Sequence, residues 1–191
     1  MPAGIRDSRR RKMHEFNSIH TERLLIRKME MTDKEDLFLY RSLPEVYLYQ
    51  SWRPSHVDEA IAFITRNAGV ALQTPGSWMQ FAICLHDGKL IGDIGIRFLE
   101  DPEQVEVGYT LSPDYQGKGY AFEALKAMID YIFQSLNMHR ITASVDPDNK
   151  RSIRLLDKIG FRKEAHFVKS YCNDEKWSDD CIFAILREEW I

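Results

Sequence analysis

The chain has 191 residues, of which 44% are hydrophobic and 29% charged, and its formal net charge is −3. This length fits one domain with a sizeable core, and the composition is ordinary for a soluble globular protein. No apolar run approaches the roughly 18 residues that span a bilayer, so we expect no membrane contact and a cytoplasmic location. Three Cys without a C-x-x-C spacing argue against a disulfide framework and against a metal site.

Positive charge gathers at the N-terminus. Residues 1–14 carry a charge of +4, which leaves −7 for the remainder of the chain. The basic head could touch nucleic acid or an acidic partner, but its composition also fits a disordered leader or an expression remnant. We take the latter for residues 1–18 and assign residues 19–191 to one folded domain. The acidic domain argues against nucleic-acid binding and suits a cationic partner such as an amine.

The first half of the chain predicts antiparallel strands and two helices. A strand is expected at residues 23–27. A capping box at residues 32–35 opens a helix that Pro44 ends, and residues 55–58 precede a second helix. Asp87-Gly88 is a strong hairpin signal between two of the strands that follow. These strands are expected at residues 78–85, 89–99 and 106–111.

The second half predicts a crossover and a closing hairpin. Its elements are a helix from about residue 121, a strand at 140–145, a helix at about 149–160, and a hairpin of 161–171 and 177–186 around Asn173-Asp174. Asn149 is a typical N-cap and Gly160 a typical residue after a helix end. Antiparallel strands, then a strand–helix–strand crossover, then a hairpin predict one mixed α/β sheet flanked by helices.

A glycine-bearing loop, residues 116–121, lies where the strand at 106–111 gives way to a helix. A helix start offers unpaired backbone N–H groups and a positive dipole end, so a phosphate can approach small residues there. The spacing is wrong for a P-loop, because Ser112 stands where the first Gly is needed. It is also wrong for the dinucleotide fingerprint, because Phe122 stands at the third small position.

The loop instead meets the pattern Gln/Arg-x-x-Gly-x-Gly/Ala through Gln116, Gly119 and Ala121. This resembles the acetyl-coenzyme A loop of the GNAT superfamily of N-acetyltransferases. A second block at residues 148–161 contains N-x-x-S-x-x-L-x-x-x-x-G-F, from Asn149 to Phe161, which is similar to the branch that acetylates ribosomal-protein N-termini (RimJ/RimL-like). The resemblance runs from about Thr21 to the C-terminus. It implies a single-domain GNAT-like α/β fold, with a mixed, mostly antiparallel sheet of about seven strands and about four helices.

The resemblance implies acetyl-CoA as cosubstrate, with its pyrophosphate on the loop and its pantetheine arm in a gap where two strands splay apart. Lys118 could add charge toward a phosphate or be a solvated lysine. Asn149 could contact the arm as well as cap a helix. A backbone N–H near Leu111 could polarise the thioester carbonyl. The residues expected to bind acetyl-CoA are Tyr109, Thr110, Leu111, Gln116, Gly117, Lys118, Gly119, Tyr120, Ala121 and Asn149.

Direct attack by the amine needs a base and a proton donor for the leaving thiolate. Glu106 is the first candidate base, because it lies in the strand beside the donor and matches a glutamate of related enzymes; Asp93 is the second. Ser152 matches a residue proposed as the proton donor in this branch, and a capping or surface serine is the alternative. Tyr120 and Tyr171 are further candidate donors, since Tyr is the more usual acid elsewhere in the superfamily.

The acceptor side is expected to involve the link between the two early helices. Tyr47, Tyr49 and Trp52 give flat surfaces for a peptide or amine, together with Asp93, although packing of the link against the sheet explains them equally simply. By resemblance, the expected acceptor is a protein N-terminal α-amino group. A polyamine, amino acid or antibiotic acceptor remains open, as does a non-catalytic acyl-CoA-binding regulator. An exposed edge of the last hairpin could support a homodimer.

Overall fold

A computed structural model of the protein describes residues 16–173 and 176–190, leaving aside the side chains of residues 173 and 176. Most of the predicted leader, residues 1–15, lies outside the described residues, as does Asp174 of the closing turn. Within the described part of the chain, no helix is both long and apolar enough to cross a membrane.

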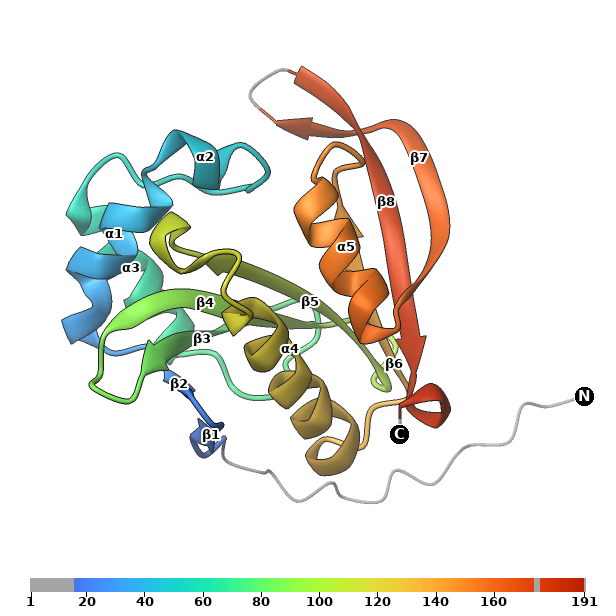
Figure 1. Cartoon of the computed structure of the whole chain (residues 1–191), viewed down its shortest axis with the longest axis horizontal. Helices are drawn as coiled ribbons and strands as arrows, with labels where there is room; N and C mark the ends of the chain where they lie inside the picture. The colour runs from blue at the N-terminus through green and yellow to red at the C-terminus, as the bar shows by residue number, and fades with distance from the viewer. Residues whose placement is uncertain (1–15, 174–175, 191) are drawn as a thin grey trace, which may run out of the picture.

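Eight strands form one sheet in the order β1-β2-β3-β4-β5-β6-β8-β7 (Figure 1). Their bounds are β1 Ile19–His20, β2 Leu24–Lys28, β3 Trp78–Leu85, β4 Leu90–Phe98, β5 Gln104–Leu111, β6 Arg140–Val145, β7 Arg162–Asn173 and β8 Lys176–Leu186. Every neighbouring pair is antiparallel except β5 and β6, which are parallel. The expected mixed, mostly antiparallel sheet is therefore confirmed, with the short β1 as an added strand.

Five α-helices accompany the sheet in the described residues: α1 Lys34–Arg41, α2 Pro44–Tyr47, α3 Val57–Ala68, α4 Tyr120–Asp130 and α5 Lys150–Ile159. A π-helical turn, Tyr131–Ser135, continues α4. The predicted strand–helix–strand crossover is β5-α4-β6. The expected capping box of the first helix is wrong in detail, because the Glu30 N–H donates to the carboxylate of Asp33 rather than Thr32 capping the helix.

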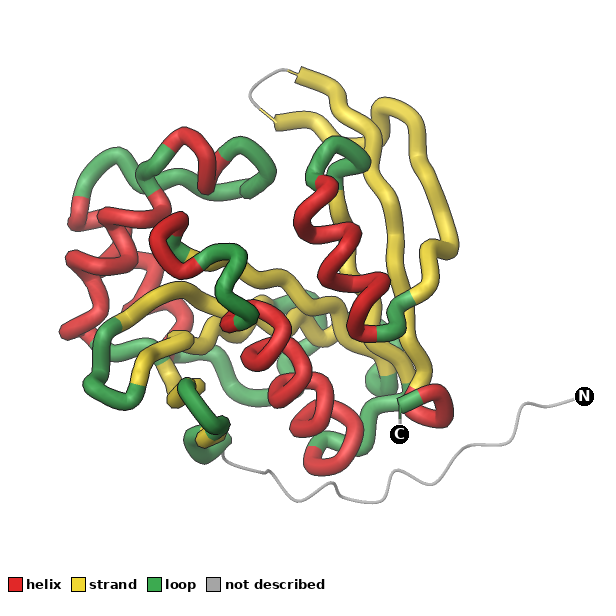
Figure 2. The backbone as a smooth tube through the Cα atoms, viewed as in Figure 1, coloured by secondary structure: helices red, strands yellow, loops and turns green. Residues whose placement is uncertain are grey.

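The helices cover opposite faces of the sheet. In Figures 1 and 2, α4 and α5 lie side by side on one face, and α1 and α3 gather at the end formed by β2, β3 and β4. The larger core cluster lies under α4 and α5 and includes Leu125, Met128 and Leu156. A smaller cluster lies under α1 and α3 and includes Leu37 and Ile64.

The two parallel strands separate after a short contact. Within β5 and β6, the pairing joins only Gln104–Glu106 to Arg140–Thr142. Beyond Glu106, β5 continues beside β4 as far as Leu111, whereas β6 continues beside β8. Within the described part of the chain, no strand pairs with one edge of the second half of β5, and this opening lies next to the starts of α4 and α5 (Figure 1).

Candidate active site

The glycine loop adopts the conformation that its composition permits. Gly117 and Gly119 have φ values of 73° and 85°, in the left-handed region where a Cβ is unfavourable. Gly119 is the N-cap of α4, and Tyr120 is its first residue. The first backbone N–H groups of α4 therefore lack helical partners and lie where the positive end of the helix dipole is strongest. The loop is a cradle that fits a phosphate group.

Gln116 holds the loop to its surroundings. Its side-chain amide donates to the carbonyl oxygen of Leu111 at 2.9 Å, and its oxygen accepts from Arg151 Nη1 at 2.8 Å. The end of β5, the loop and α5 are thereby joined by one side chain. In this arrangement Gln116 fixes the position of the cradle, and its own polar atoms are occupied by the protein.

A second clamp comes from Arg23, which the sequence did not single out. Its Nη1 donates to the carbonyl oxygen of Lys118 at 3.0 Å, and its guanidinium lies 4.4 Å from the centre of the Tyr120 ring. Glu123, on α4, accepts from Arg23 Nε at 2.6 Å and from Thr21 Oγ1 at 2.6 Å. These bonds lower the pKa of Glu123 against the opposing effect of burial. The loop is thus braced by the turn just before β2 as well as by α5.

Tyr109 and Ser152 face each other across the opening between β5 and α5. The two hydroxyl oxygens are 2.7 Å apart. Asn149 caps α5 by accepting from the Ser152 N–H at 3.1 Å, which sets where Ser152 lies in the first helical turn. Burial raises the pKa of Tyr109 to about 12, with the bond to Ser152 opposing it. At neutral pH the phenol therefore keeps its proton.

The other predicted cofactor residues lie at the end of β5 and in the loop that follows it. Thr110 and Leu111 are buried at the end of β5, and Thr110 Oγ1 has no hydrogen-bond partner among the described residues. Ala121 packs against the larger core, while the Lys118 ammonium is 5.8 Å from the Tyr115 ring. Lys118 is exposed, so its charge is available to a ligand.

Glu106 stands on the opposite face of β5 from Tyr109, because side chains alternate along a strand. Its carboxylate pairs with Arg97, which lies directly across on β4. Burial raises the pKa of Glu106, Arg97 opposes that shift, and the negative charge of Asp180 reinforces it. A carboxylate with a raised pKa is a better proton acceptor, which suits a general base.

Asp93 has a different place from the one predicted. It is fully buried, and its carboxylate binds Tyr40, Arg41 and Gln80. Burial raises the pKa of Tyr40, so its hydroxyl remains a donor to this carboxylate. With its oxygens occupied and no exposed surface, Asp93 cannot contact an acceptor here, and its observed role is to anchor Arg41.

The three predicted aromatic residues have three settings: Tyr47 ends α2, and Tyr49 and Trp52 lie in the link between α2 and α3. Trp52 stacks on Phe63 with ring centres 4.4 Å apart, so packing occupies one face of its ring. Tyr47 lies under Arg53 at 4.5 Å. Tyr49 is partly exposed, and its hydroxyl is 3.4 Å from the carbonyl oxygen of Asp148, just before α5. Of the three, Tyr49 is the one that reaches the opening.

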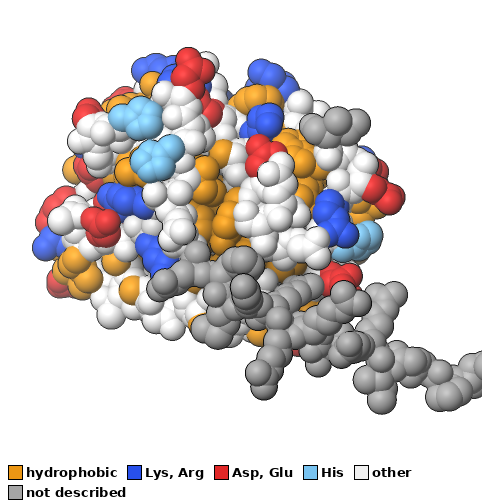
Figure 3. Space-filling model, turned by 90° about the horizontal axis from the view of Figure 1, so that it is seen from below, with side chains coloured by type: hydrophobic (Ala, Val, Ile, Leu, Met, Phe, Trp, Pro, Cys, Tyr) orange, Lys and Arg blue, Asp and Glu red, His pale blue; other side chains and the backbone are white. Residues whose placement is uncertain are grey.

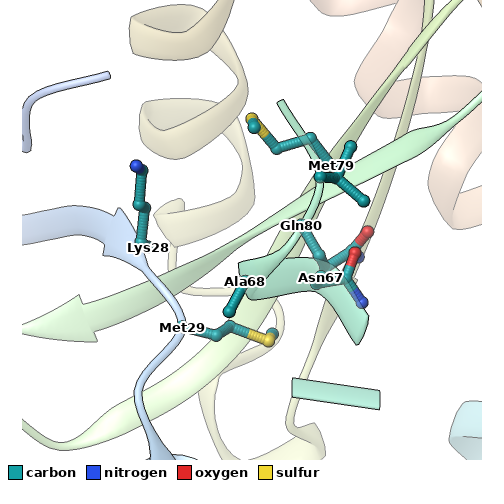
Figure 4. A pocket seen from close by; sticks show the side chains of 7 residues that line it. Lys28, Met29, Asn67, Ala68, Met79 and Gln80 are labelled. Atoms are coloured by element: carbon teal, nitrogen blue, oxygen red, sulfur yellow. The ribbon is translucent and has the colours of Figure 1, made fainter. Parts of the chain in front are cut away.

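Two pockets lie outside the opening. Figure 4 shows one between the end of α3 and strands β2 and β3, lined by Lys28, Met29, Asn67, Ala68, Val70, Met79 and Gln80. None of these residues belongs to the loop, so the pocket is separate from the phosphate cradle. The other lies beside α4 and includes His20, Arg23, Lys126 and Lys158. The lower face of the molecule shows a band of apolar side chains with basic ones around it (Figure 3).

Three residues of the site were not predicted from the sequence: Arg23, Arg97 and Trp78. Trp78 and Arg97 are opposite each other on β3 and β4, and Arg97 is opposite Glu106 on β5. Alternation within each strand shows which residues share a face, but the register between strands must be known to bring these three together. For Arg23, no local pattern points to a loop nearly a hundred residues away.

Comparison with known proteins identifies one family. The family model described as acetyltransferase (GNAT) domain matches residues 23–162. YnaD of Bacillus subtilis, an uncharacterized N-acetyltransferase, is 36% identical over 173 residues, 90% of this chain and 98% of that protein. The ribosomal protein uS5-alanine N-acetyltransferase of Escherichia coli is 39% identical over 84 residues, 44% of this chain and 43% of that protein. A crystal structure of a GNAT-family acetyltransferase from Bacillus anthracis has a TM-score of 0.82 at 33% identity, covering 91% of this chain and 100% of that chain.

Proposed function

We propose that this chain, which belongs to the GNAT family of N-acetyltransferases, acetylates the α-amino group of a protein N-terminus. Its family makes it an acyltransferase that uses acetyl-CoA; the acceptor and the residue roles are our proposal. The observation that carries the proposal is the opening beyond Glu106, which has a phosphate cradle at one end and the partly buried carboxylate of Glu106 on the opposite face of the strand.

The loop binds the pyrophosphate of acetyl-CoA. Backbone N–H groups from about Gly117 to Ala121 donate to it, and the start of α4 adds its dipole. Lys118 is exposed beside this cradle. The pocket along α4, with Lys126 and Lys158, borders the same loop and supplies cations for the remaining phosphate of the cosubstrate.

The pantetheine arm of acetyl-CoA binds along the edge of β5 that pairs with no described strand. Tyr109, Thr110 and Leu111 lie along this edge, and Asn149 at the start of α5 faces it from the other side. A peptide-like arm can bond to free backbone groups there as a strand would. A backbone N–H near Leu111 then polarises the thioester carbonyl.

Glu106 acts as the base, directly or through a water. An α-amino group has a pKa of about 8, whereas an alkyl amine such as that of lysine has a pKa of about 10.4. The α-amino group therefore loses its proton to a carboxylate more readily than a polyamine does. This difference favours a protein N-terminus, and the uS5-alanine N-acetyltransferase relative supports the same class of acceptor.

Ser152 gives its proton to the leaving thiolate, and Tyr109 resupplies it. The 2.7 Å contact between the two hydroxyls provides the path for this transfer. Because the pKa of Tyr109 is raised to about 12, Tyr109 holds a proton throughout the neutral range. We propose the cytoplasm as the place of the reaction, since nascent or ribosomal N-termini are found there.

The test is release of coenzyme A thiol from acetyl-CoA in the presence of peptides, polyamines, amino acids or aminoglycosides. We expect fastest release with peptides that have a free N-terminus, and none when that terminus is blocked. A preference for polyamines would contradict the acceptor class. Thermal stabilisation by acetyl-CoA without release with any amine would instead indicate a binding-only regulator.

A further inference from the structure

Trp78 lies flat across two neighbouring strands of the sheet. A Cβ built on Gly95 of β4 would be 2.9 Å from Trp78 Cε3, and one built on Gly108 of β5 would be 3.4 Å from Trp78 Cη2. Neither glycine is among those with positive φ, so their backbone conformation does not require glycine. At Gly95 an added Cβ would meet Gln80 Oε1 as well as the indole, and at Gly108 it would touch the ring edge at ordinary contact distance. The indole therefore rests close to both strands, and Trp78 is still 38% exposed.

The indole borders the candidate base. Gly108, under its ring, lies two residues after Glu106 on the same face of β5. Arg97 connects the two, since its guanidinium is 5.6 Å from the centre of the Trp78 ring and pairs with Glu106. The parallel pairing of β5 and β6 ends at Glu106, so the indole lies beside the opening.

This is the face of the sheet from which an amine must approach. Tyr109 and the starts of α4 and α5, proposed to hold the donor, are on the other face. An acceptor that used Glu106 as its base would therefore arrive over Trp78 and Arg97. Whatever is attached to the amine has to lie on these two side chains.

We propose that Trp78 is the platform for the first side chain of a peptide acceptor, while Arg97 binds the carbonyl next to the amine. This inference rests on the proposed function and names its specificity-determining residue. The Arg97 side chain is 40% exposed, and its Nε has no hydrogen-bond partner among the described residues.

Polyamines fit this surface poorly. A cation already lies beside the indole, so a second ammonium over the ring would meet like charge. A polyamine also has no carbonyl to accept from Arg97. A peptide N-terminus offers both a carbonyl and, unless its first residue is glycine, an apolar group for the indole.

The first experiment compares Trp78→Ala and Trp78→Phe with the unchanged protein, using peptides that begin with Ala or with Gly. For the Ala peptide, Trp78→Ala should raise KM about tenfold, as the loss of an aromatic contact would. For the Gly peptide, the rise in KM should be several-fold smaller. Trp78→Phe should retain most of the affinity for the Ala peptide, and KM for acetyl-CoA should not change in either variant. Equal effects on both peptides, or a shift in KM for acetyl-CoA, would overturn the inference.

The second experiment is a double-mutant cycle with Gly108→Val. A Cβ at this position lies 3.4 Å from the ring edge, which is ordinary contact, so the two methyl groups beyond it need space that the indole occupies. KM for the Ala peptide should therefore rise a few-fold in the presence of Trp78 and stay unchanged in the Trp78→Ala background. The same rise in both backgrounds would overturn the inference. If Trp78→Ala does not fold, Trp78→Phe and Gly108→Val, each with its KM for both peptides, decide the question.

The two proposals fail differently. An unchanged protein that acetylates no amine refutes the proposed function, and the inference falls with it. An active protein whose preference between the Ala and Gly peptides is insensitive to Trp78 refutes the inference alone.

Discussion

The two faces of the sheet contribute to the site in different ways. The donor face is built from one continuous segment, in which β5, the glycine loop, α4, β6 and α5 follow each other. The face proposed for the acceptor presents Trp78, Arg97 and Glu106, one from each of three strands. Beside it, Arg41 pairs with Asp93 and donates to Gln50 in the link between α2 and α3. Residues of one segment form a motif that can be recognised from its spacing in the sequence. A surface assembled from several strands can vary without any recognisable motif.

The largest effect should come from the base on the acceptor face. Glu106→Gln is expected to lower kcat about 100-fold or more with little change in KM for acetyl-CoA, because a positioned general base contributes 10² to 10⁴. The measurement is initial-rate kinetics with a peptide acceptor. Glu103→Gln, at an exposed position three residues earlier, is the control and should leave kcat unchanged. A similar kcat for Glu106→Gln and Glu103→Gln would remove Glu106 as base.

The next effect concerns the donor face alone. Gly119→Ala places a Cβ at a φ of 85° and 3.3 Å from Arg23 Nη2, which should distort the cradle and raise KM for acetyl-CoA about tenfold. Gly76→Ala is the matched control, because its φ is 73° and nothing lies within 4 Å of the added Cβ. Both variants should lose similar stability, but only the first should lose affinity for acetyl-CoA. Equal KM values would show that the loop does not bind the donor.

A smaller effect is expected from the brace behind the loop. The lowered pKa of Glu123 means that its bonds stabilise the folded state above the ordinary glutamate pKa, and that this contribution is lost as pH falls through the lowered value. Glu123→Gln should therefore cost about 1–2 kcal/mol of unfolding free energy at neutral pH and less in acid. Urea unfolding at both pH values measures this. Glu45→Gln, at an exposed position on α2, is the control and should leave the unfolding free energy at neutral pH unchanged.

The smallest expected effect concerns the pair of Arg97 and Glu106 on the acceptor face. Arg97 opposes the raised pKa of Glu106, so Arg97→Gln should raise that pKa further. Because the base works in its ionised form, the acidic limb of the kcat/KM profile should move to higher pH. In the Glu106→Gln background the same change should produce no shift. If the acidic limb does not move in Arg97→Gln, Arg97 does not affect the pKa of Glu106.

The sequence predicted the donor face better than the acceptor face. The helix start at the loop of residues 116–121, the cap at Asn149 and the helix end at Gly160 are local backbone features, and their positions are confirmed. The sequence predicts Asp93 as a base or acceptor contact, because a strand position alone does not show which helix covers it; α1 contributes Tyr40 and Arg41, which bind its carboxylate. Trp78 gave no signal, since its position depends on two glycines in other strands.

The most direct test of this account is a crystal structure with coenzyme A and an acceptor peptide bound together. We predict that the thiol lies between β5 and β6 beyond Glu106, and that the peptide amine lies on the opposite face beside Glu106 and Trp78. A peptide amine found on the same side as α4 and α5 would contradict the division of the site between two faces of the sheet.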